Sequence, residues 1–406
     1  MRTRPLLMGL AALVFLVCMG VASVFLAGRP ARPSLAASAY GTPVVVTTIP
    51  NVGNGPWDIA VDPTTNYVYV SNNGGGVTVI NGATNATETV VPLDGNDQVG
   101  IAVNPEADRI YVGRGTSAHD DVVVINSSST PMATVTAVPV GHAALSLAVN
   151  LETDRIYAAV SANDKVAVID GATNQVTATA TVTPGSYPLG VAVDRITNLV
   201  YVANQNTSNV SLIDGATNTV LGTPIPLGGP LGGTSPKDVD VNPNTHRVYV
   251  ANYGTNDVSV IGGTPQAEVT RVSVCNRPYG VAVNPVTNRV YVCCHGGDSV
   301  WVIDGTTNGV LGSPIPVGSS PMKLAVDPNT NRIYTANSGN NTVSVIQDFP
   351  IPGVGGIAEL PALEAEAAAV QGGSSGPDRL ALGALAAAGA LVVVTGALYA
   401  RRRWLR

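Results

Sequence analysis

The sequence predicts an all-β fold, a seven-bladed β-propeller that is closed by a strand from its own N-terminal part. Three observations predict it. Seven similar units follow one another between about residues 40 and 348, and each unit holds a tyrosine at a fixed distance from its start. The last unit lacks one strand, and the beginning of the repeat region can supply it.

Each unit starts with a short apolar stretch that ends in Asp or Asn. These residues are 42 to 48 positions apart, the length of one four-stranded blade, and a tyrosine follows each after seven positions. The constant offset indicates that the turn between the first two strands keeps its length. The Asp and Asn residues are Asp62, Asn104, Asn150, Asp194, Asn242, Asn284 and Asp327, and the tyrosines, which we expect to pack between blades, are Tyr69, Tyr111, Tyr157, Tyr201, Tyr249, Tyr291 and Tyr334.

The first unit illustrates the four strands of a blade. Alternating β-branched and aromatic residues predict strands over 59–61, 67–70, 77–80 and 87–91, with Asn and Gly in the turns between them. The seventh unit has only three strands, which end at 343–346. Residues 44–52 are similar to the fourth-strand segment 310–317 of the sixth unit, so we expect them to complete the last blade.

The two ends of the chain predict export and a membrane anchor. Residues 1–39 combine Arg2 and Arg4 with an apolar run and an Ala-x-Ala pattern ending at Ala39, typical of a signal peptide or an uncleaved signal anchor. Residues 380–400 carry no charge and are long enough to span a bilayer, and the basic tail 401–406 places that end in the cytoplasm. A Pro-, Gly- and Ala-rich linker, 349–379, separates this helix from the propeller at 40–348.

The units resemble the YVTN-type β-propeller repeats of bacterial and archaeal surface proteins. The resemblance rests on Tyr201-Val202-Ala203-Asn204 and on Tyr249-Val250-Ala251-Asn252, and it covers about residues 42 to 346. It implies the propeller fold and a place at the cell surface. It implies little about activity, because one fold hosts many functions.

Composition narrows the range of partners. The formal net charge is -6 and only 12% of residues are charged. Nucleic-acid binding needs a cluster of Lys and Arg, and such a cluster occurs only at the extreme C-terminus, where the membrane explains it better. The expected partners are the membrane, through the C-terminal helix, and a cell-envelope glycan or another surface protein. No cofactor and no catalytic group are expected, because the sequence has no phosphate-binding Gly loop and no recognisable nucleophile–base pair.

Irregular loops should gather on one face of the ring, where second-to-third-strand turns meet the blade-to-blade connections. Trp57, Tyr187 and Tyr279 lie in these connections and are candidate ligand contacts. No metal site is expected, because no histidine or carboxylate has the spacing of a known motif. Four residues near the same face should be solvated loop residues, with a metal site as the alternative: His119, Asp120, Asp121 and His142. His246 lies on the opposite face, which is uniform and expected to be structural, and should be merely solvated.

Three cysteines lie in the exported part. In an oxidising compartment Cys275 could form a disulfide with Cys293 or with Cys294, and we favour Cys293. Alternatively, Cys293 fills a small buried position, as Ala203 does two units earlier. One thiol remains free in either case.

The sequence as a whole favours a membrane-anchored, extracellular propeller that acts as a non-catalytic binding module. Two alternatives stay open. The protein could be an exported enzyme of the lyase, lactonase or dehydrogenase type with its site at the central opening, or a structural component of a surface layer.

Overall fold

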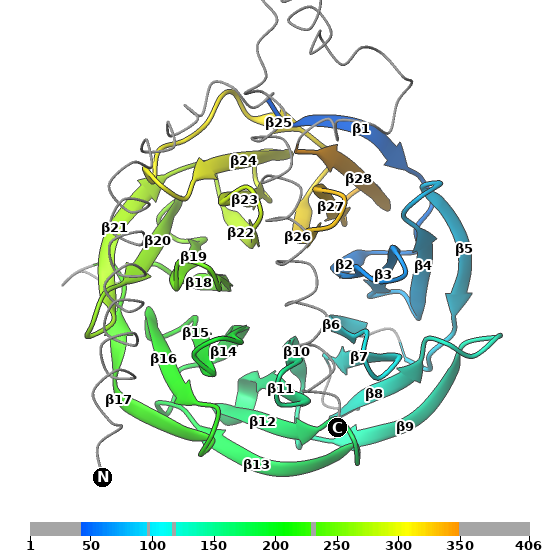
Figure 1. Cartoon of the computed structure of the whole chain (residues 1–406), viewed down its shortest axis with the longest axis horizontal. Coiled ribbons are helices and arrows are strands. Elements are labelled where there is room, and N and C mark those ends of the chain that lie inside the picture. The colour runs from blue at the N-terminus through cyan, green and yellow to red at the C-terminus, as the bar shows by residue number, and fades with distance from the viewer. Residues whose placement is uncertain (1–41, 96–97, 116–118, 229–232, 349–406) are drawn as a thin grey trace, which may run out of the picture. The chain divides into compact units, whose positions relative to one another are not determined.

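Seven four-stranded antiparallel sheets form a ring in the computed structural model, which describes residues 42–348 except 96–97, 116–118 and 229–232 (Figure 1). The predicted seven-bladed propeller is therefore confirmed. The predicted signal segment, linker, membrane helix and basic tail lie outside these residues. Within the described part of the chain, no helix has the length and apolar character needed to cross a bilayer.

In each blade the first strand lies at the centre of the ring and the fourth at its rim (Figure 1). The first strands are β2 (Pro56–Asp62), β6 (Gln98–Asn104), β10 (Ala144–Asn150), β14 (Pro188–Asp194), β18 (Pro236–Asn242), β22 (Pro278–Asn284) and β26 (Pro321–Asp327). The second strands are β3 (Tyr67–Asn72), β7 (Arg109–Arg114), β11 (Arg155–Val160), β15 (Leu199–Asn204), β19 (Arg247–Asn252), β23 (Arg289–Cys294) and β27 (Arg332–Asn337).

The third strands are β4 (Val77–Asn81), β8 (Asp121–Asn126), β12 (Lys165–Asp170), β16 (Asn209–Asp214), β20 (Asp257–Gly262), β24 (Ser299–Asp304) and β28 (Thr342–Gln347). The fourth strands are β5 (Ala86–Val91), β9 (Ala133–Pro139), β13 (Gln175–Thr181), β17 (Thr219–Pro226), β21 (Ala267–Ser273), β25 (Ile315–Pro316) and β1 (Val44–Ile49). A 3₁₀ turn, η2 (Ser161–Asn163), joins β11 to β12.

The ring is closed as the sequence predicts, since β1 is the outer strand of the seventh blade. It pairs antiparallel with β28, from Val44 opposite Gln347 to Ile49 opposite Val343. The outer strand of the sixth blade, β25, is shorter than the predicted 310–317, and Val310 forms only an isolated bridge with Ile303.

The core lies between neighbouring blades. All seven matched tyrosines are at most 1% exposed, and Tyr111, for example, packs with Ile156 and Ala158 of the next blade. The predicted packing role of the tyrosines is therefore confirmed.

Blades are also joined on the uniform face. The residue that ends a first strand bonds to the left-handed turn residue of the following blade, as in Asn150 Nδ2 to Asn198 Oδ1 at 2.8 Å and Asn242 Nδ2 to Asn288 Oδ1 at 2.7 Å. His246 takes the turn position in the fifth blade, where its Nδ1 lies 2.6 Å from Oδ2 of Asp194. The expectation that His246 is merely solvated is wrong, because its ring is bonded to a fully buried carboxylate.

Candidate functional site

One end of the central channel opens into a cleft of about 530 Å³. Its walls come from the starts of first strands and from the turns between second and third strands, the two groups of segments that the sequence places on one face. Trp57, Tyr187 and Tyr279, the three expected ligand contacts, line this single cleft. Lys237, Gln205 and Asn206 line it as well.

Aromatic rings meet around Tyr279. Its ring makes edge-to-face contacts with Trp57 at 6.1 Å and with Tyr253 at 6.3 Å between centroids, and the ring of His295 lies 6.0 Å away. Burial raises the pKa of Tyr279, so its hydroxyl stays neutral at physiological pH. The cleft therefore presents a rigid apolar wall with a hydroxyl in it.

A single ammonium group lies beside these rings. Lys237 Nζ is 5.2 Å from the ring centroid of Tyr253 and 5.7 Å from that of Tyr279, and it donates a hydrogen bond to Gln205 Oε1 at 2.9 Å. Burial lowers the pKa of Lys237. Lys237 forms no ion pair among the described residues, so the cleft carries a positive charge that a ligand can neutralise.

The loop that carries Tyr187 is held by Asp164. Tyr187 has a left-handed backbone with φ of 51°, and its N–H donates to Asp164 Oδ1 at 2.9 Å, while the N–H of Gly185 donates to Oδ2 at 2.5 Å. Burial by itself raises the pKa of Asp164, but these backbone hydrogen bonds together outweigh it and hold the pKa below its ordinary value. The carboxylate thus fixes one wall of the cleft.

The channel also holds charged side chains, around a cavity of about 240 Å³ lined by the first strands. Asp58 comes from β2, Asp238 and Asp240 from β18, and Lys323 from β26. Lys323 Nζ donates to Asp238 Oδ1, and both side chains are less than a tenth exposed. Desolvation alone would lower the pKa of Lys323, but the Asp238 and Asp58 carboxylates outweigh it and raise that pKa.

The channel carboxylates bond to the backbone of the next blade. Asp240 Oδ2 accepts from Val283 N at 2.7 Å, and Asp238 Oδ2 accepts from Val281 N at 3.0 Å. Burial, only partly offset by Lys323 and by backbone hydrogen bonds, raises the pKa of Asp58 to about 6, and burial raises that of Asp240 to about 7. These two carboxyls can therefore exchange protons near neutral pH.

Tyr279 links the cleft to the channel. After desolvation, the next largest contribution to its raised pKa is the charge of Asp238, and Asp58 adds to it. Its hydroxyl is thus within electrostatic reach of the channel carboxylates, while its ring forms the wall of the cleft.

Sequence reasoning missed the four charged residues of the channel. Most first strands carry apolar or small residues at these positions, as in Gly-Val-Ala-Val at 190–193 and at 280–283. By contrast, 58–61 reads Asp-Ile-Ala-Val, 238–241 reads Asp-Val-Asp-Val and 323–326 reads Lys-Leu-Ala-Val. A charge within a strand that is otherwise apolar is the signal that could have revealed them.

The histidines and carboxylates suggested for a metal do not form a metal site with one another. Asp121 is instead paired with Arg114, whose Nε and NH2 donate to its two oxygens at 2.6 and 2.5 Å, and His142 Nδ1 accepts from Ala143 N at 2.8 Å. Among the described residues, which include His119 and Asp120, no three His, Cys, Asp or Glu side chains are grouped as metal ligands.

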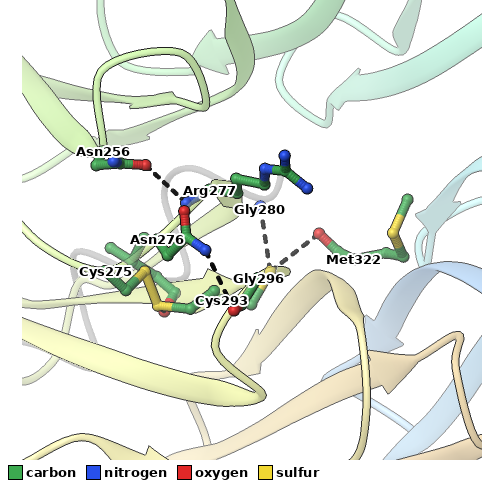
Figure 2. Close-up of a disulfide and its surroundings, with 10 residues drawn as sticks. Asn256, Cys275, Asn276, Arg277, Gly280, Cys293, Gly296 and Met322 are labelled. Atoms are coloured by element: carbon green, nitrogen blue, oxygen red, sulfur yellow. Dashed lines mark hydrogen bonds between the residues drawn. A yellow bond between two sulfur atoms is a disulfide. The ribbon is translucent and has the colours of Figure 1, made fainter.

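The disulfide joins Cys275 to Cys294, with a Cα–Cα distance of 5.7 Å, and this corrects the favoured pairing with Cys293 (Figure 2). Adjacent residues of a strand face opposite ways. Cys293 points into the core, where its thiol donates to Met322 O at 2.9 Å and accepts from Gly280 N at 3.1 Å. The alternative, that Cys293 fills a small buried position, is confirmed.

The disulfide lies next to the wall of the cleft. Arg277 N donates to Asn256 Oδ1 at 2.8 Å, and Asn276 Nδ2 bonds to Gly296 O at 3.4 Å, so the loop before Tyr279 is fixed at several points (Figure 2). The cross-link and these bonds position Tyr279.

Comparison with known proteins assigns the chain to a family. The sequence pattern described as "Lactonase, 7-bladed beta-propeller" matches residues 165–375, slightly more than half of the chain. The chain belongs to this family. The related YVTN-type repeat family, expected from the sequence, is not the one that matched.

A solved structure has a fold similar to that of this member of the lactonase propeller family. A chain of the Kuenenia stuttgartiensis hydrazine synthase aligns with a TM-score of 0.63 and 20% identity, over 72% of this chain and 95% of that chain. At this identity the similarity concerns the fold alone. No curated protein matches the sequence.

Proposed function

We propose that the protein is a cell-surface propeller that binds a saccharide unit of a cell-envelope glycan in the cleft formed by Trp57, Tyr187 and Tyr279. The observation that carries the proposal is the aromatic wall around Tyr279 at the mouth of the channel. Flat aromatic faces pack against the C–H faces of a sugar ring. The amides of Gln205 and Asn206 supply the donors and acceptors that sugar hydroxyls need.

The charge of Lys237 refines the class of saccharide. A lysine without a carboxylate partner in the described structure favours a sugar that carries an acid group, such as a uronic acid. A cleft of about 530 Å³ is within the ordinary range for small-ligand sites.

The test is a calorimetric titration of the detergent-solubilised full-length protein with soluble uronic-acid-containing glycan fragments. Trp57→Ala and Tyr279→Ala should each weaken binding by about tenfold or more, as is usual for central aromatic contacts. Tyr67→Ala, which removes an aromatic ring on the opposite face, should leave it unchanged. Absence of binding, or equal affinity of all four proteins, would refute the proposal.

Location outside the cell is part of the same proposal. It is supported by the predicted signal segment and membrane helix and by the disulfide, which is typical of oxidising compartments. The full chain should sediment with membranes and be cleaved when protease is added to intact cells, and deletion of residues 380–406 should release it. A full chain found in the soluble cell fraction would contradict this location.

A second function, lactone hydrolysis, is favoured by the family match and by the channel carboxyls. Asp240, with a pKa of about 7, could take a proton from a water molecule that attacks the lactone carbonyl. The ring C–O bond then breaks, and the leaving oxygen takes up the proton.

A pH-stat assay with δ-gluconolactone separates the two functions. If the protein hydrolyses the lactone, wild type should release acid faster than the uncatalysed reaction does. Asp240→Asn should lose this activity and keep its affinity for the glycan. If wild type releases acid only at the uncatalysed rate, lactonase activity on δ-gluconolactone is excluded and the proposed binding function is unaffected.

A further inference from the structure

The uniform face of the ring carries one exception to its repeat pattern, between the fourth and fifth blades. In six blades the last residue of the third strand has a polar side chain, whereas the fifth blade has Gly262 there. The six polar residues are Asn81, Asn126, Asp170, Asp214, Asp304 and Gln347.

An arginine next to this exception has no side-chain partner among the described residues. Arg247 begins β19 next to Gly262, since Val248 pairs with Ile261, and it makes no hydrogen bond or ion pair within the described part of the chain. Arginines at the same position of other blades are all bonded. Arg109 bonds Ala107 O at 3.1 Å, Arg155 bonds Thr177 Oγ1 at 3.1 Å, Arg289 bonds Asp348 Oδ1 at 2.7 Å and Arg332 bonds Gly82 O at 2.5 Å.

His246 stands beside this arginine, and it replaces the Asn or Asp that occupies the turn in the other blades. Its Nδ1 is bonded to Asp194, which is fully buried, so the ring is held in one orientation. Its second nitrogen has no hydrogen-bond partner among the described residues. The second nitrogen lies on the side of the ring away from Asp194.

A cavity of about 710 Å³ lies at this point, lined by Arg247, His246 and Gly262 together with Leu199, Pro265 and Val269. Val269 is 52% exposed, although its side chain is apolar. The cavity thus combines an unpaired guanidinium with an apolar wall.

We propose that this cavity is a binding site for a small organic carboxylate, distinct from the cleft on the opposite face. Arg247 receives the carboxylate through charge-assisted hydrogen bonds, the ring of His246 lines the cavity beside it, and the apolar body of the ligand packs on Leu199 and Val269. Gly262 leaves the space beside Arg247 open, since no atom lies within 4 Å of where its Cβ would be, and an Asp side chain introduced there would place a negative charge next to the guanidinium.

Gly262→Asp provides a sharp test, because it restores the acidic residue of other blades. A Cβ built on Gly262 meets no atom within 4 Å, and its backbone is not left-handed, so the variant should fold normally. Arg247→Met removes the charge directly. Arg155→Met removes an arginine from the same repeat position of another blade and is the matched control.

The probe is benzoate, with uncharged benzamide as the matched ligand, titrated into full-length protein and followed by ligand-observed NMR. Wild type and Arg155→Met should bind benzoate with a Kd on the order of 1 mM and benzamide about tenfold more weakly. Gly262→Asp and Arg247→Met should weaken benzoate binding about tenfold. The melting temperature of Gly262→Asp should not fall.

The proposal is overturned if wild type does not bind benzoate, if it binds benzamide equally well, or if either variant binds benzoate as wild type does. Glycan binding in the cleft should be unchanged in both variants, so failure here leaves the proposed function untouched.

Discussion

Asp240 shows how burial in the channel changes the chemistry of one residue. Its pKa is about 7, against an ordinary value of 3.8. Between these two pH values the folded protein therefore keeps a proton that the unfolded chain has lost. Unfolding then releases a proton, so this group makes the free energy of unfolding fall as pH rises from about 4 to about 7. Asp58, with a pKa of about 6, acts in the same direction over a narrower window.

Replacing Asp240 should therefore remove part of the pH dependence of stability. In urea titrations, the free energy of unfolding of wild type should fall between about pH 5 and about pH 8. This fall should exceed that of Asp240→Asn by about 2 kcal/mol. Asn carries no titratable proton, so its curve should be flatter over this range. Parallel curves would show that Asp240 titrates near its ordinary value in the folded protein.

At the residue scale, the role of a residue that recurs in every blade could be predicted from the sequence. The role of a residue that occurs once could not. The seven tyrosines share one position, so their buried packing was predictable. Lys323 and Asp238 are 85 positions apart and meet across the channel, and no local pattern contains that contact. The role of a single charged residue in a first strand depends on which side chain faces it from other blades.

At the element scale, the connection between β21 and β22 leads into Tyr279, the second residue of β22. The disulfide partner of Cys275 was predicted wrongly because Cys293 and Cys294 are adjacent. Only the direction in which each side chain points distinguishes the two. Comparison within the repeat gives the physical reason. Cys294 occupies the position of Asn204 and Asn252, whose side chains bond the first residue of the next strand. Cys293 occupies the position of the buried Ala203 and Ala251.

Removal of this disulfide should destabilise the propeller. The bridge closes a loop with a sequence separation of 19, so Cys275→Ala with Cys294→Ala should lower the free energy of unfolding by about 3 kcal/mol in urea titrations. It should also weaken glycan binding, because the loop before Tyr279 becomes less fixed.

Cys293→Ala is the control for this experiment. Blades three, four, five and seven carry alanine at that position, so this substitution should cost no more than about 1 kcal/mol and leave binding unchanged. A double variant as stable as Cys293→Ala would contradict a structural role for the bridge.

The whole molecule depends on closure of the ring. The number of blades and the closing strand were predictable, because both follow from counting strands in units of nearly constant length. The sites were less so, because a propeller forms its clefts and channel from residues of every blade, and small deviations from the repeat decide their chemistry. Gly262 is such a deviation, and its meaning is visible only beside Arg247 and His246 in space.

Deletion of β1 should show how much stability closure provides. Without β1, the edge of β28 loses its pairing from Val343 to Gln347, and the 4% exposed Ile49 is removed from the core.

Two proteins should be secreted behind the same cleavable signal, one lacking residues 1–41 and one lacking residues 1–49. The longer deletion should lower the free energy of unfolding by at least about 3 kcal/mol and expose a strand edge that promotes self-association, seen by light scattering. The shorter deletion retains β1 and should match the full repeat region in both measurements. Equal stability and equal mass of the two proteins would mean that the seventh blade holds without its fourth strand, and that the ring is maintained by packing between blades alone.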